Sequence, residues 1–195
     1  MITLIQRMKP ALRLTILAAL AVLASCAPHP KAPLHGMQLT PPRAASNFTL
    51  TDQNGKPFSL AQTQGQAVVL YFGFTHCKDV CPQTLALLGK ARAQAKATPE
   101  QLHIVMVSVD PAHDTPAALR SFFNRIDVAA TGLTGSEAQL ARVWRAYGVV
   151  VQPQKDDITH TDAIFLIDRQ GRIVETLVPE MPLKDVAADL RSVLD

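Results

Sequence analysis

Three continuous apolar runs, rich in β-branched residues, dominate the hydrophobic pattern of the chain: Ala67–Phe74, Leu102–Val109 and Ala163–Ile167. Short runs without polar alternation are typical of strands that are buried on both faces of a sheet. Two weaker segments, Asn47–Leu50 and Pro57–Leu60, flank an Asn-Gly turn. That arrangement predicts a β-hairpin at the N-terminal end of the folded domain.

Helical patterns fill the spaces between these runs. Helices are predicted from Pro82 to Lys96, from Asp114 or Thr115 (as N-cap) to Arg125, from Ser136 to Tyr147 and from Pro182 to Leu194. After the third apolar run, a turn leads into Arg172–Leu177, which is expected to pair antiparallel with that run. Alternating strands and helices predict an α/β fold with a central, mostly parallel sheet and helices on both faces. Ligands of such sheets bind at the carboxyl ends of the strands.

The N-terminus has the layout of an export signal. A basic segment precedes the apolar run Leu14–Leu23, which is shorter than the roughly 20 residues needed to span a bilayer core. Small residues then lead to Cys26 in the segment Leu23–Cys26, which is similar to a bacterial lipobox. We expect residues 1–25 to be a lipoprotein signal peptide and Cys26 to carry lipid, with the domain facing the periplasm of a bacterial cell envelope. An ordinary signal peptide that happens to contain a cysteine is the alternative.

Residues 26–46 are predicted to be a tether, because they contain five prolines and show no apolar period. The domain is then expected at 47–195, a usual single-domain length. Five of the 19 basic residues precede residue 47, whereas all 16 acidic residues follow it. The domain is therefore slightly acidic and has no basic stripe, which argues against a nucleic-acid partner.

Cys77 and Cys81 stand four positions apart directly after the first apolar run. Outside the cytoplasm such a pair is usually a disulfide, but a bridge that closes so short a loop constrains the unfolded chain little. A chemical role is therefore the better explanation: a redox-active pair, a thiolate nucleophile or a soft metal site. Pro82 is expected to keep both cysteines on the turn before the helix, where backbone N–H groups lower a thiol pKa.

A metal site with two thiolates needs a further donor. Five of the six histidines lie in the tether, in a strand, in a loop or beside Cys77, and are not expected to be ligands: His29, His35, His76, His103 and His113. His160 directly precedes the third apolar run. A histidine in such a loop is more often a polar surface residue than a ligand, but its place beside a second sheet strand makes it the remaining candidate.

Three segments carry a resemblance to a known family. Gly73–Pro82 resembles the Cys-Pro-Asp-Val-Cys-Pro motif of the Sco/SenC family, and Val107–Pro116 resembles its Ser-Val-Asp-Pro segment. His160 and Thr161, followed by a strand and an Asp-x-x-Gly turn, resemble its third block. The resemblance covers Asn47–Asp195 with the blocks in order. Three positions depart from the family pattern without removing a ligand: Lys78 in place of proline, His113 where arginine is common, and Thr159 where an acidic residue is common.

The resemblance implies a thioredoxin-like fold, a membrane anchor and copper, as Cu(I) or Cu(II), bound by Cys77, Cys81 and His160. It also implies a role in assembling the binuclear copper centre of cytochrome c oxidase. The partners would be a copper donor protein and a recipient, either cytochrome c oxidase subunit II or another copper-receiving protein. Two thiolates and one imidazole suit Cu(I), and three protein ligands leave a position open for transfer.

The main alternative is an extracytoplasmic thiol–disulfide oxidoreductase, with a thiol peroxidase as a weaker choice. Redox motifs of the thioredoxin type usually have two residues between the cysteines, and thiol exchange needs no distant histidine. This chain has three intervening residues and a candidate histidine, which favours copper. A dual role, in which the thiols reduce the recipient's cysteines before copper is loaded, stays open.

Overall fold

The computed structural model describes residues 33–154 and 157–194 of the chain. The predicted signal peptide (1–25), the predicted lipidation site Cys26 and His29 lie outside the described residues. From Pro33 onwards the chain forms one compact unit. Within the described part, no helix is both long enough and apolar enough to cross a membrane.

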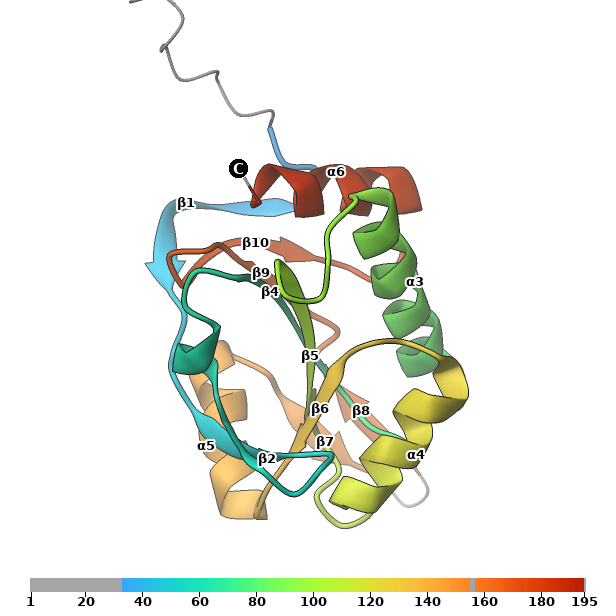
Figure 1. Ribbon diagram of the computed structural model, residues 1–195. Coiled ribbons are helices and arrows are strands. Elements are labelled where there is room, and N and C mark those ends of the chain that lie inside the picture. Colours follow the sequence, from blue (N-terminus) through green and yellow to red (C-terminus); the bar gives the residue numbers. More distant parts are fainter. Residues whose placement is uncertain (1–32, 155–156, 195) are drawn as a thin grey trace, which may run out of the picture. The chain divides into compact units, whose positions relative to one another are not determined.

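An eight-stranded sheet runs through the domain in the order β1-β10-β9-β4-β5-β6-β2-β3 (Figure 1). Its strands are β1 (Met37–Ala44), β2 (Thr49–Asp52), β3 (Pro57–Ser59), β4 (Ala67–Gly73), β5 (Leu102–Ser108), β6 (Thr131–Thr134), β9 (Ile164–Ile167) and β10 (Arg172–Leu177). Only the central strands β4, β5 and β6 pair in parallel, and the remaining pairs are antiparallel. The α/β class is confirmed, but the expected parallel pairing is limited to the centre of the sheet.

The helices are α3 (Val80–Gln94), α4 (Pro116–Ile126), α5 (Glu137–Tyr147) and α6 (Leu183–Ser192), with a short 3-10 helix, η1, at Leu60–Thr63. Two parallel crossovers, β4–α3–β5 and β5–α4–β6, step in the same direction along the sheet. Because such crossovers are right-handed, α3 and α4 lie on one face, and α5 lies on the other (Figure 1). α3 packs against α6, which completes the first layer.

The capping signals in the sequence explain where the helices begin. Thr115 is the N-cap of α4, its hydroxyl accepts a hydrogen bond from the N–H of Ala118, and Pro116 follows it at the first helical position. Ser136 starts α5 with a capping box that includes Gln139. Both helices were predicted from these residues, and both predictions are confirmed.

The strand β1 corrects the expected tether. Met37–Ala44 pairs antiparallel with β10, with Met37 opposite Thr176 and Ala44 opposite Arg172. The register shifts between Gln38 and Arg43, the stretch that contains two prolines. Proline is tolerated in an edge strand at such an irregularity, because the missing N–H faces no partner there. The folded domain therefore begins before residue 47.

His35 and Gly36, just before β1, are hydrogen-bonded to Asp189 and Glu175 of the domain. We call this set of contacts the N-terminal junction. The Nδ1 atom of His35 lies 2.7 Å from Oδ1 of Asp189, and the N–H of Gly36 donates to Glu175. Both carboxylates are fully buried, and burial, together with the neighbouring Asp189, raises the pKa of Glu175 to about 7. His35 was expected to be a solvated tether residue. Its side chain is 45% exposed, as expected, but its ring and its backbone N–H both hydrogen-bond Asp189, so it belongs to the edge of the folded domain.

Candidate metal centre

The two cysteines lie where β4 leads into α3. The strand ends at Gly73, a loop carries Cys77, and the helix already begins at Val80. Cys81 therefore lies inside the first helical turn and is fully buried, although it was expected on the turn before the helix. Pro82 is the third helical residue, a position whose N–H has no partner within a helix, so proline causes no loss there.

Cys77 and Cys81 are both free thiols. The backbone N–H of Cys81 donates to Sγ of Cys77 over 3.3 Å, so the helix N-terminus supports the Cys77 sulfur. Cys77 is partly exposed, whereas Cys81 is closed off from solvent. The pair thus has one accessible sulfur and one internal sulfur.

Burial raises the pKa of Cys81 to about 12, although the nearby Tyr71 hydroxyl and the Phe74 backbone act in the other direction. The expectation that the helix N-terminus lowers the thiol pKa is therefore wrong for Cys81, because desolvation is the larger effect. At neutral pH this thiol keeps its proton until a cation displaces it.

Tyr71 lies beside Cys81 at the end of β4. Its hydroxyl is buried. Among the described residues, no group lies in hydrogen-bonding geometry with it. Gly73 is required for this packing: a Cβ there would lie 2.7 Å from Cε1 of Tyr71 and 3.2 Å from Sγ of Cys81. A buried thiol suits a soft cation such as Cu(I), which would replace the thiol proton.

Asp114 fixes the loop that carries Cys77. Its buried carboxylate accepts hydrogen bonds from the N–H of Thr75 (3.0 Å), the hydroxyl of Thr75 (2.6 Å) and the hydroxyl of Ser108 (2.5 Å). These contacts join the start of the cysteine loop to the end of β5. Burial raises the pKa of Asp114, and the three hydrogen bonds oppose that rise.

His160 lies in a small second sheet, in which β7 (Val151–Pro153) pairs antiparallel with β8 (Ile158–His160). Only 6% of its side chain is exposed. Its ring packs edge-on against Phe74, with 6.0 Å between the centroids. Nδ1 lies 3.1 Å from the carbonyl oxygen of Thr161. A carbonyl only accepts, so Nδ1 carries the proton and Nε2 keeps a lone pair for a metal.

The three predicted copper ligands are therefore neighbours, but they do not form an assembled site. The cysteines are adjacent, and His160 packs against Phe74, at the start of the loop that carries Cys77. Within residues 33–154 and 157–194, the group of three such donors at metal-ligating distance is a different one: His76, Asp110 and His113. The donor atoms of Cys77, Cys81 and His160 do not all lie within 4.8 Å of one another, so copper binding by the predicted set requires some rearrangement of these side chains.

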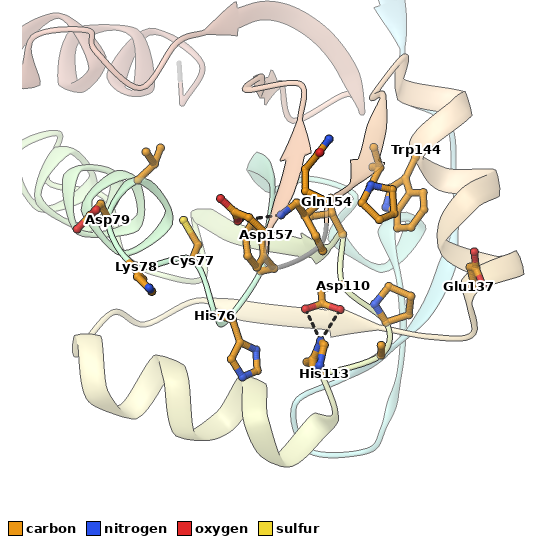
Figure 2. Close-up of a pocket in the computed structure, with 18 residues that line it drawn as sticks. His76, Cys77, Lys78, Asp79, Asp110, His113, Glu137, Trp144, Gln154 and Asp157 are labelled. Atoms are coloured by element: carbon orange, nitrogen blue, oxygen red, sulfur yellow. Dashed lines mark hydrogen bonds and ion pairs between the residues drawn. The ribbon is translucent and has the colours of Figure 1, made fainter.

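A cavity of about 890 Å³ opens beside Cys77 (Figure 2). Its walls come from the cysteine loop, the loop after β5, α5 and the β7–β8 hairpin. Titratable residues line it: His76, Cys77, Lys78, Asp79, Asp110, His113, Glu137 and Asp157. Cys77 thus faces an open space that is large enough for part of another molecule.

From the sequence, neither His76 nor His113 was expected to be a metal ligand, because each was considered by itself. The structure brings them together, since their rings lie 5.0 Å apart on two loops that follow adjacent strands. The parallel pairing of β4 and β5 was the available signal, because it places both strand ends at one edge of the sheet. His103, by contrast, lies within β5, where Nε2 is 2.9 Å from the hydroxyl of Thr131, and its assignment as a strand residue is confirmed.

Comparison with known proteins identifies one family model and several similar proteins. A family model described as SCO1/SenC matches residues 37–195. A protein of Stutzerimonas stutzeri named "Putative copper-binding protein" is 33% identical over 159 residues, which cover 78% of each chain. The chain spans about half the length of the mitochondrial Sco relatives that it matches.

Two solved structures have the same fold. Bradyrhizobium japonicum ScoI with copper bound has a TM-score of 0.70 and 34% identity, over 77% of this chain and 99% of that one. A SCO1/SenC family lipoprotein from Bacillus anthracis has a TM-score of 0.71 and 28% identity, over 80% of this chain and 99% of that one. The family match covers every described strand and helix, and the matched segment contains both cysteines and His160. The chain belongs to the SCO1/SenC family.

Proposed function

We propose that the chain is a membrane-anchored copper-binding protein that delivers copper to the binuclear centre of cytochrome c oxidase. The observation that carries the proposal is the pair of free thiols at a cavity wall, with Cys77 facing the cavity and Cys81 buried behind it. Copper is the cargo, and the residues hold it as Cys77 Sγ, Cys81 Sγ and His160 Nε2. The copper-bound relative from B. japonicum supports this assignment.

The unequal exposure of the two sulfurs suggests an order of transfer. Cys77 is the sulfur that a recipient's ligand reaches first, because only Cys77 lines the cavity. Cys81 remains bound to the copper ion until ligands of the recipient have completed its coordination. Three protein ligands leave a coordination position open for that exchange. The recipient would be cytochrome c oxidase subunit II or another copper-receiving protein, and a separate donor protein would load the site.

His160→Ala is expected to lower Cu(I) affinity about 100-fold while leaving reversible formation of the Cys77–Cys81 disulfide unchanged, since thiol exchange needs no imidazole. Competition with a chelator measures the first quantity, and thiol trapping across a series of redox buffers measures the second. His103→Ala is the matched control, because that ring lies within β5 and should leave both quantities unaltered.

A thiol–disulfide oxidoreductase is the second candidate. It is favoured by the partly exposed Cys77, which could attack a disulfide, and by the buried Cys81, which could resolve the mixed disulfide. The His160→Ala variant separates the two functions: unchanged copper affinity together with lost reductase activity would favour the oxidoreductase. Reduction of the recipient's cysteines before copper transfer would combine both roles.

The anchor is a proposal of its own. Cys26 is expected to carry lipid in the mature chain, and the B. anthracis relative described as a lipoprotein supports this. Mass spectrometry of protein extracted from membranes should find an acylated N-terminal Cys26, and Cys26→Ala should release the domain or block processing. A mature chain that begins at Ala27 without lipid would contradict the proposal.

A further inference from the structure

A second group of metal-ligating side chains lines the same cavity as Cys77, where the cysteine loop meets the loop after β5. His76 from the cysteine loop and Asp110 and His113 from the loop after β5 each offer one ligand atom, and these atoms all lie within 4.8 Å of one another. Figure 2 shows the two histidine rings beside each other, with the Asp110 carboxylate directly against His113.

The geometry of this group is close to that of a metal site. Nδ1 of His113 lies 2.8 Å and 3.0 Å from the two carboxylate oxygens of Asp110. Neighbouring donors on a tetragonal ion, each at about 2.0 Å and at right angles, are about 2.8 Å apart. An ion that displaces the Nδ1 proton therefore fits between these two groups with little movement. His76, whose side chain is exposed, completes the set, since one of its ring nitrogens already lies within 4.8 Å of the other two ligand atoms.

The charge distribution favours a cation. Asp110 is 94% buried, and the imidazole of His113 is the one side chain that hydrogen-bonds its carboxylate among the described residues. A buried carboxylate is stable only when it is paired or coordinates a metal. The cavity has four acidic side chains, Asp79, Asp110, Glu137 and Asp157, against one lysine, Lys78.

We propose that His76, Asp110 and His113 bind one divalent transition-metal ion, Cu(II) more tightly than Zn(II). Two imidazoles and a carboxylate are the donors that such ions prefer, and Cu(II) leads the affinity order for a site of this kind. The site is chemically distinct from the thiol pair, which selects Cu(I). It requires His113 in particular, because His113 is the residue that contacts the buried Asp110 carboxylate directly.

The test removes the proposed copper ligands first. The detergent-solubilised full chain with Cys77→Ala, Cys81→Ala and His160→Ala is titrated with CuSO4, followed by calorimetry and electron paramagnetic resonance. One Cu(II) per chain is expected, with nitrogen hyperfine structure from two imidazoles. Adding His113→Asn should weaken binding about 100-fold and remove one nitrogen from the spectrum. His113 is 64% exposed and asparagine keeps an N–H group that can donate to Asp110, so the fold should persist, and circular dichroism checks it.

His103→Asn and His29→Asn, each added to the same triple variant, are the matched controls and should bind Cu(II) unchanged. Loss of the ion in the His29→Asn chain, equal binding with and without His113, or no Cu(II) bound by the triple variant would each overturn the proposal. Because the thiols are absent throughout, failure here leaves the proposed Cu(I) function untouched, and failure of Cu(I) binding in the native chain leaves this site untouched.

Discussion

Cys77→Ala is expected to lower the Cu(I) affinity of the reduced protein by about 1,000-fold, more than the roughly 10- to 100-fold that follows from loss of an outer-shell partner. The change removes one of two thiolates, and no described cysteine other than Cys81 could replace it. Competition with a Cu(I) chelator measures the affinity, and X-ray absorption counts the sulfur neighbours, which should fall from two to one.

Cys81→Ala is the paired variant and should lose a similar amount of affinity. The two variants should differ in how fast the remaining thiol is alkylated. In Cys81→Ala the partly exposed Cys77 remains and should react rapidly, whereas in Cys77→Ala the buried Cys81 remains and should react slowly. Only nitrogen and oxygen neighbours around bound Cu(I) in the native chain would refute the assignment of the thiols.

Asp114→Ala is expected to lower the free energy of unfolding by about 3 kcal/mol, because three hydrogen-bond donors lose their shared carboxylate acceptor and two of them start the cysteine loop. The same variant should bind Cu(I) more weakly, since the loop that carries Cys77 loses its attachment to β5. Urea denaturation of the apo-protein measures the first effect.

Asp110→Ala is a suitable comparison for stability, because that carboxylate hydrogen-bonds the side chain of exposed His113 rather than the cysteine loop. It should reduce stability less and leave Cu(I) affinity near the native value. An Asp114→Ala protein with native stability would mean that the Thr75 and Ser108 groups find other acceptors, and that Asp114 does not hold the loop.

The parts of the fold that could be predicted are those whose signal is local. The runs that became β4 and β5 are buried on both faces, and α4 and α5 begin at their caps, so a few neighbouring residues determine each element. The edge strand β1 could not be predicted in this way. Its prolines and its exposure hide a strand whose stability comes from pairing with β10, more than 100 residues later.

In the candidate site, too, the features that depend on neighbouring residues could be predicted, and those that depend on distant contacts could not. Spacing and position in the sequence were enough to single out Cys77 and Cys81, but not to show that Cys81 is buried beside Tyr71, which raises the thiol pKa instead of lowering it. The approach of His76 to His113 depends on two loops that meet only after β4 and β5 have paired. Properties that arise from distant contacts need the structure.

The N-terminal junction also has a mechanical consequence. A pull on the chain before Pro33 is first resisted by the contacts of His35 and Gly36 with Asp189 and Glu175, and then by the edge pairing of β1 with β10. Two further strands, β10 and β9, separate β1 from β4, the strand that leads to the cysteines. A pull at the N-terminal end of the described residues therefore loads the outer edge of the sheet before it reaches the strand that leads to the cysteines.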